Sequence, residues 1–292
     1  MANLKEVRTR ITSVNSTKQI TSAMKMVSAA KLRKAQNAVI QMRPYAKKLT
    51  EILQNLSSGL DSSEGIYSKE REVKNVLLIP ITSNRGLCGA FNANVIKEAN
   101  RLIKKYKGKE ITVLSIGKKA DDYYKKTEYR IMGTTLPRNL NTLFDNLDFD
   151  HVAPAAQKIM AAFANKQFDR IYIIYNQFKN AAVQVLTTEQ FLPVLPPEKE
   201  EGKKVTNDYI FEPDKEQIVQ ELIPKSLKTQ LYKALLDSQA AEHGARMTAM
   251  HKATDNAEDM LKELRLSYNK ARQAAITGEI LEIVGGAEAL NK

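Results

Sequence analysis

Apolar side chains in residues 1–60 recur at alternating spacings of three and four, which is the pattern of a coiled-coil helix. The heptad positions are apolar at Leu4, Val7, Ile11 and Val14 and again at Leu32, Ala35, Val39, Met42, Ala46 and Leu49. Between these runs the strict heptad passes through Lys18, Thr21, Lys25 and Ser28, while apolar side chains lie one position earlier, at Ile20, Met24 and Val27. Polar residues at seam positions lower the stability of a coiled coil, and this stretch is therefore a place where another partner can pack. We therefore predict one long helix over 1–60, with a possible kink at Pro44 and a polar middle.

Residues 225–277 show the same spacing, with a stripe rich in small side chains. This stretch holds no proline and one glycine, Gly244. The stripe consists of Leu227, Leu231, Ala234, Ala241, Ala245, Ala257, Leu261, Leu264, Ala271 and Ala275. About 55 helical residues make a rod of roughly 80 Å, which is too long to bury its stripe against one small domain. Because two such rods bracket the chain, we predict that they pack against each other, antiparallel, as a discontinuous shaft of residues 1–60 and 215–292.

The central part of the chain alternates strand-like and helix-like segments. Buried-strand patterns cover 76–82, 111–116, 171–175 and 183–188, and helical patterns cover 90–106, 117–126 and 151–165. This alternation predicts an α/β (Rossmann-like) domain with a mainly parallel sheet. Three prolines and a charged run over 193–204 mark a linker. The predicted domains are the first helix (1–60), the α/β domain (65–205), and a foot segment with the C-terminal helix (206–292).

The positive charge is concentrated in the first helix. The chain has 45 Lys and Arg against 33 Asp and Glu, a formal charge of +12. Residues 1–50 contribute +10, whereas residues 225–292 and the middle contribute +1 each. Such an imbalance suggests an acidic partner. The alternative is a nucleic-acid binder that uses the first helix on phosphates, which predicts a strong salt dependence of duplex binding.

The composition excludes several protein classes. The longest aliphatic run, Val76–Ile81, has six residues, far short of the roughly 20 that span a bilayer. Residues 1–10 lead into polar sequence rather than the apolar core of a secretory signal, so we expect neither membrane insertion nor export. With Cys88 as the only cysteine, a disulfide within the chain and a thiolate metal cage are excluded, and a reducing compartment follows. We expect Cys88 to be a small buried side chain.

The sequence shows no active site. The turn at residues 85–90 carries two glycines but matches neither phosphate-binding motif, G-x-G-x-x-G or G-x-x-x-x-G-K-[ST], which favours a tight turn. His151, His243 and His251 form no metal-ligand set. We expect no catalytic residue, cofactor or metal, and a protein that transmits or scaffolds. An enzyme that uses the α/β domain on a nucleotide is a further alternative, for which dialysis of the isolated chain with ATP is the test.

Three groups of motifs resemble the gamma subunits of F-type ATP synthases. The first group is ITSAMKMV at 20–27, AKLRKA at 30–35 and RPY at 43–45, and the second is RGLCGAFN at 85–92. The third is ARMTAM at 245–250, ATDNA at 253–257, YNKARQ at 268–273 and ITGEI at 276–280. These motifs span the chain in the family's order and at its spacing.

The resemblance implies a non-catalytic rotor in a hetero-oligomer. In this family the shaft penetrates a ring of three alpha and three beta subunits, and the foot sits on the membrane c ring beside the epsilon subunit. Proton flow turns the ring and the shaft, which forces each beta subunit through the conformations that make ATP. Because residues 1–10 show no transit-peptide pattern, we expect a bacterial subunit, bound peripherally to the cytoplasmic side of the cell inner membrane, with a mature organellar form as the alternative. The paired cysteines that give chloroplast relatives their redox control are absent.

The resemblance places particular residues at these contacts. Those at the alpha and beta subunits are Met24, Lys25, Arg246, Gln273, Thr277, Ile280 and Ile283. Those at the c ring and epsilon are Tyr209, Phe211 and Glu212. For any one of them, a place in the core or on an ordinary helix surface is the competing interpretation. Gly278, where helix formers are more favourable, is expected to make the tip more flexible.

Overall fold

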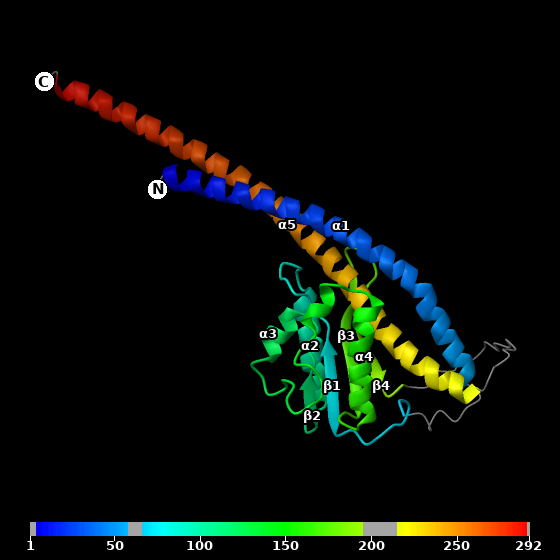
Figure 1. Ribbon diagram of the computed structural model, residues 1–292. Helices are drawn as coiled ribbons and strands as arrows, with labels where there is room; N and C mark the ends of the chain where they lie inside the picture. Colours follow the sequence, from blue (N-terminus) through cyan, green and yellow to red (C-terminus); the bar gives the residue numbers. More distant parts are fainter. Residues whose placement is uncertain (1–3, 58–65, 195–214, 291–292) are drawn as a thin grey trace. The chain divides into compact units, whose positions relative to one another are not determined.

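The computed structural model describes residues 4–57, 66–194 and 215–290 (Figure 1). The chain divides into two compact units, Met1–Ser28 with Met247–Lys292 and Ala29–Arg246. The first is named here the helix-pair unit and the second the α/β unit. The predicted domain boundaries near 65 and 205 lie outside the described residues, as do Tyr209, Phe211 and Glu212.

Two long helices contribute to both units. Helix α1 (Leu4–Ser57) has 54 residues and includes Pro44. Helix α5 (Lys215–Leu290) has 76 residues and includes Pro224. It therefore begins before residue 225, where the proline-free pattern starts, because one proline removes a single hydrogen bond and the neighbouring turns continue the helix. The helix also continues through Gly278, and the flexibility expected there stays a prediction.

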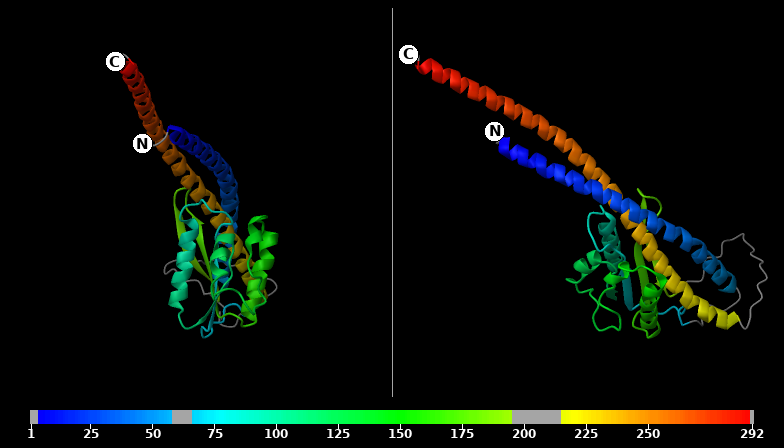
Figure 2. Two further views of the ribbon diagram at one scale, coloured as in Figure 1. Left: turned by 90° about the vertical axis from the view of Figure 1, so that its left-hand side faces the viewer. Right: turned by 45° about the horizontal axis from the view of Figure 1, so that its top comes forward.

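The helix-pair unit is an antiparallel pair. Its cross-helix contacts join Lys18 to Glu258 and Thr21 to Thr254, so residue numbers fall along α5 as they rise along α1. Apolar side chains fill the seam on both sides of these contacts, at Val7, Met250, Ala257 and Leu261. Within this unit α5 extends past the N-terminal end of α1 (Figures 1 and 2). The predicted antiparallel packing is confirmed.

The α/β unit contains a four-stranded sheet in the order β2-β1-β3-β4. The strands are β1 (Asn75–Pro80), β2 (Glu110–Val113), β3 (Arg170–Phe178) and β4 (Gln184–Leu192). Strand β1 runs parallel to both neighbours, with Leu77 paired to Thr112 and to Ile171. Strand β4 is antiparallel to β3, because a short hairpin joins them and a parallel connection needs a long crossover. The mainly parallel sheet is thus confirmed, with one antiparallel edge.

Helices cover both faces of this sheet (Figure 2). Helices α2 (Phe91–Lys105) and α3 (Lys118–Tyr124) pack on one face, where Val95, Leu102 and Tyr124 join a buried cluster with strand residues. Helix α4 (Phe149–Ala164) covers the other face together with the first part of α5, which adds Leu227 and Leu231 to the larger cluster. A short 3-10 helix, η1 (Asn141–Phe144), precedes α4. The sheet core is therefore sealed by residues far apart in sequence.

Candidate functional site

The seam of the helix pair is polar in its middle, as the strict heptad predicts. The Nζ atom of Lys18 lies 3.2 Å from a carboxylate oxygen of Glu258, and the hydroxyl of Thr254 donates to that of Thr21 over 2.8 Å. The Nζ atom of Lys25 lies 3.4 Å from Nδ1 of His251. Since exposed pairs of this kind add little stability, this stretch is held less firmly than an apolar seam.

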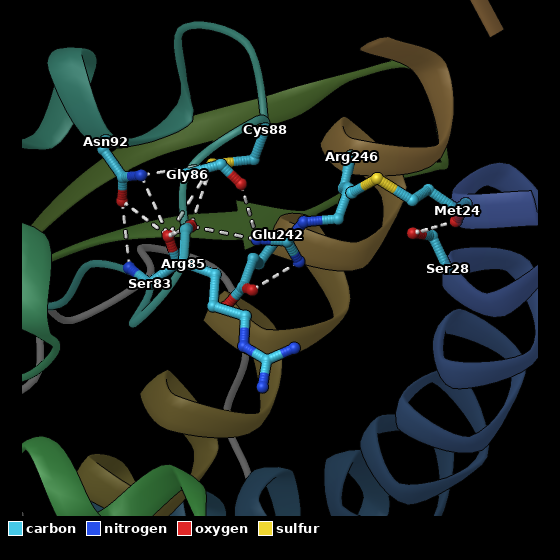
Figure 3. Close-up of polar contacts among 9 residues, drawn as sticks. All are labelled: Met24, Ser28, Ser83, Arg85, Gly86, Cys88, Asn92, Glu242 and Arg246. Carbon is cyan, nitrogen blue, oxygen red and sulfur yellow. Dashed lines mark hydrogen bonds and ion pairs between the residues drawn. The ribbon is translucent and has the colours of Figure 1, made fainter. Parts of the chain in front are cut away.

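Apolar side chains lie beside this seam and face solvent. Ile20 is 60% exposed, whereas the adjacent Thr21 is only 8% exposed. Val27 and Met26 are exposed in the same way, next to the buried Ser28. The hydroxyl of Ser28 donates to the carbonyl oxygen of Met24 over 2.7 Å (Figure 3). A weak seam beside exposed apolar side chains is a surface that a partner can cover.

The predicted contact residues of α1 lie at this surface. Met24 and Lys25 are both half-buried, so part of each side chain remains accessible. On α5, the predicted residues Gln273 and Thr277 are exposed. The structure thus leaves all four available to a partner, and their contact with one stays a prediction.

The C-terminal part of α5 is an exposed apolar tip. Ile280 and Ile283, both predicted contact residues, are 55% and 71% exposed. Ile276, Leu281 and Val284 are exposed as well. With the spacing of these five residues at about 100° per residue, they form one broad apolar face, and Glu279 and Glu282 lie on the opposite side. A broad apolar face that no described residue covers is a surface on which a partner can pack, and the contact itself stays a prediction.

Arg246 has a structural role within the α/β unit (Figure 3). Its Nη1 lies 2.6 Å from Oε1 of Glu242, and its Nη2 donates to the carbonyl oxygens of Arg85 and Gly86 over 3.0 and 3.2 Å. Burial raises the pKa of the Glu242 carboxyl group, and the Arg246 guanidinium opposes that rise. Arg246 therefore braces the turn after β1. Its contact with other subunits stays a prediction beside this intrachain role.

The turn after β1 is a packed turn rather than a phosphate cradle. The Ser83 hydroxyl donates to the Arg85 carbonyl over 2.6 Å, and the Asn92 amide donates to the Cys88 sulfur over 3.1 Å. Phosphate sites present backbone N–H groups to the ligand. This turn instead presents carbonyl oxygens, which accept hydrogen bonds from the Arg246 guanidinium. Cys88 is buried, and burial raises the pKa of its thiol. Its predicted role as a small buried side chain is confirmed.

The three histidines lie in separate environments. His151 is at the start of α4, with Nδ1 2.7 Å from Asp148, and His251 lies 3.3 Å from Asp255 on α5. Burial, with Arg246 and Lys31 nearby, lowers the pKa of His243 to about 4. The described residues contain no group of three or more His, Cys, Asp or Glu that could hold a metal. Among these same residues, no helix has the length and apolar character to cross a membrane.

A second arginine brace was missed in the sequence. Nη2 of Arg43 on α1 donates to the carbonyl oxygen of Phe178 over 3.0 Å and lies 3.5 Å from Oδ1 of Asp237 on α5. The Asp237 side chain is 0% exposed, and burial raises the pKa of its carboxyl group. One signal was available, because an acid directly after Leu235 and Leu236 on an apolar stripe needs a cationic or hydrogen-bonding partner.

Comparisons with known proteins agree along the whole chain. The family model described as ATP synthase matches residues 3–290. The ATP synthase gamma chain of Flavobacterium johnsoniae is 62% identical over 292 residues and covers 100% of both chains. That of Geotalea daltonii is 45% identical over 293 residues and covers 99% of both.

Solved structures show the same fold. A chain from the central stalk and c-ring structure of the Tetrahymena thermophila mitochondrial ATP synthase is 26% identical, with a TM-score of 0.59 over 80% of this chain and 99% of that chain. A chain from the Euglena gracilis mitochondrial ATP synthase is 22% identical, and its TM-score of 0.65 over 98% of this chain and 94% of that chain supports the fold alone. The chain therefore belongs to the ATP synthase family as a gamma chain, the non-catalytic subunit of the central stalk.

Proposed function

We propose that this chain is the rotor that transmits rotation of the membrane c ring to a hexamer of alpha and beta subunits, coupling proton translocation to ATP synthesis. The observation that carries the proposal is the helix pair with a polar seam and outward apolar side chains such as Ile20 and Ile283. Such a rod is stabilised by what surrounds it. A rotor can shift the beta subunits between conformations only if its contacts differ from one conformation to the next.

The proposed contacts with the hexamer form two groups. Met24 and Lys25 on α1 meet the beta subunits near the polar seam, where the basic first helix attracts acidic loops without a rigid lock. Gln273, Thr277, Ile280 and Ile283 on α5 lie in the sleeve around the tip, and Arg246 is proposed to add a contact while it braces the turn. Tyr209, Phe211 and Glu212 are proposed to meet the c ring and epsilon.

The proposal includes the organisation of the chain and its place in the cell. Residues 1–60 and 215–292 are proposed to form one discontinuous shaft, and residues 65–205 the α/β domain. The chain is a peripheral subunit of a membrane complex, and we place it on the cytoplasmic side of the bacterial inner membrane. The described helices agree with a peripheral position, since none could span a bilayer.

Reconstitution with a gamma-depleted hexamer and the membrane sector tests the proposal. We expect the full chain to restore ATP-driven proton pumping, and the variant Ile280→Asp with Ile283→Asp to retain assembly and lose most of the pumping per ATP hydrolysed. The matched control is Glu279→Asp with Glu282→Asp, which keeps the charge of the same turn. Pumping that is equal in all three chains, or that is restored without this chain, contradicts the rotor function.

A further inference from the structure

The two helical layers of the α/β unit differ strongly in charge. Residues 97–138, which include most of α2 and all of α3, hold twelve basic and five acidic side chains. The other layer is formed by α4 and the first part of α5, and it is near neutral: residues 141–194 hold four basic and five acidic side chains, and residues 221–246 hold four basic and three acidic ones. The sum of charges over the middle of the chain is near neutral and does not reveal this difference. The difference appears only when the residues are assigned to the two layers of the fold.

All twelve basic side chains on the first layer are exposed. We name them the α2–α3 face, and they are Lys97, Arg101, Lys104, Lys105, Lys107, Lys109, Lys118, Lys119, Lys125, Lys126, Arg130 and Arg138. Arg101 pairs with Glu98 and Lys125 with Asp122. The other ten form no ion pair with any described residue. Because these charges repel one another, the face favours an anionic surface nearby.

The chemistry of the face differs from that of a protein interface. Nine of the twelve residues are lysines, whereas the centres of protein interfaces are poor in lysine and rich in arginine and aromatic residues. Among the described residues 97–138, the exposed large apolar side chains are Tyr123 and Met132 alone. Lysine is a hydrated point charge on a flexible stem, which suits a diffuse array of negative charges better than one fixed carboxylate.

We propose that the α2–α3 face binds an anionic membrane surface through lipid phosphate groups. Its densest part is the end of α2 and the turn after it, where Lys104, Lys105, Lys107 and Lys109 occupy four of six positions. The family belongs to a membrane-bound complex, so such a surface is at hand. The attraction falls off within a Debye length of about 8 Å. It draws this face of the subunit toward the bilayer, and it is independent of the proposed rotor function.

Sedimentation of the full chain with vesicles tests the proposal. The vesicles are phosphatidylcholine alone or phosphatidylcholine mixed with phosphatidylglycerol. Each lysine near the surface contributes about a fivefold gain in binding, so Lys104, Lys105, Lys107 and Lys109→Gln together should weaken binding to the anionic vesicles by about 100-fold or more. Changing the same four residues to Arg should retain the binding, because it retains the charge.

The matched control removes four charges from α1, as Arg8, Arg10, Arg33 and Lys34→Gln. We expect this control to keep most of the vesicle binding. Equal losses in the two Gln variants would show that net charge rather than the face decides, and would overturn the proposal. It is also overturned if the α2–α3 variant binds like the unchanged chain. Circular dichroism checks that each variant keeps its helix content.

Discussion

The two units of this chain reach stability by different means. The α/β unit encloses side chains such as Leu77, Phe163 and Tyr175 with no exposed surface. The helix-pair unit buries one stripe, and several of its large apolar side chains, Ile20 and Leu266 among them, remain exposed. A sheet between two helical layers buries both of its faces, whereas two helices bury only the strip between them. The comparison teaches that the α/β unit is complete by itself and that the helix pair is suited to completion by its surroundings.

The largest loss of stability is expected when a large side chain is removed from the core of the α/β unit. Phe163→Ala should lower the free energy of unfolding by about 3–5 kcal/mol, because it leaves a cavity among buried neighbours. Leu261→Ala in the helix pair should cost less, about 2 kcal/mol. Urea unfolding followed by the near-ultraviolet dichroism of the tyrosines measures both. Leu266→Ala, at an exposed site, serves as the control, and a larger loss for Leu261 than for Phe163 would reverse the comparison.

The second effect is a pH dependence specific to the α/β unit. The pKa of His243 lies at about 4 rather than 6.5, so the unfolded chain takes up a proton between these values that the folded chain does not. The contribution of His243 to the free energy of unfolding is therefore fully present above pH 6.5. It is lost as the pH drops toward 4, which lowers the free energy of unfolding by on the order of 3 kcal/mol. The difference between the pH profiles of the unchanged chain and His243→Gln isolates this contribution. Parallel profiles would contradict it.

Filling the polar seam should strengthen the helix pair. Thr21→Leu with Thr254→Leu replaces a hydroxyl contact by apolar burial and should add about 2 kcal/mol. Hydrogen exchange of the amides in residues 10–28 measures the gain. Thr9→Leu is the control, since the Thr9 hydroxyl, like that of Thr254, donates to the carbonyl oxygen four residues earlier but faces solvent. If Thr9→Leu slows the exchange of these amides as much as the double variant does, the polar seam does not limit the stability of the helix pair.

The smallest effect compares two glycines of α5. A Cβ atom on Gly244 would lie 3.0 Å from the carbonyl oxygen of Ala181, whereas one on Gly278 would have no neighbour within 4 Å. Gly278→Ala should add up to about 1 kcal/mol through helix propensity. Gly244→Ala should lose that gain to crowding against the β3–β4 hairpin. The midpoint temperatures of thermal unfolding of the two variants test this prediction. Equal stabilisation would contradict it, because it would show that the hairpin moves away from the added methyl group at no cost.

Periodicity along the chain predicts the elements of this fold well. Apolar spacings place both long helices and the parallel strands, because each reflects contacts repeated within a few residues. The choice between Thr21 and Ile20 as the seam position is harder, since adjacent stripes both follow a helical period. Continuing the strict heptad from Val14 to Leu32 identifies the buried stripe, and the apolar content of the neighbouring stripe does not.

Contacts between distant residues could not be predicted from the sequence. The braces from Arg43 to Phe178 and from Arg246 to Arg85 join residues more than a hundred positions apart, and no local pattern encodes such a distance. The resemblance to the family suggested Arg246 as a contact residue, but its hydrogen bonds to the turn required coordinates. The antiparallel β4 follows from its short hairpin, a signal that was present in the spacing of the two last strands.

The helix-pair unit combines the first and the last segments of the polypeptide, Met1–Ser28 and Met247–Lys292. At the usual 5–20 residues per second, the ribosome needs about 10–40 s after synthesising residue 28 to reach residue 247. During that interval Val7 and its neighbours have no partner helix, whereas the α/β unit is complete as soon as Arg246 has been synthesised. The helix pair can therefore assemble only once residues 247–292 have been synthesised, and the N-terminal segment lacks its partner helix until then.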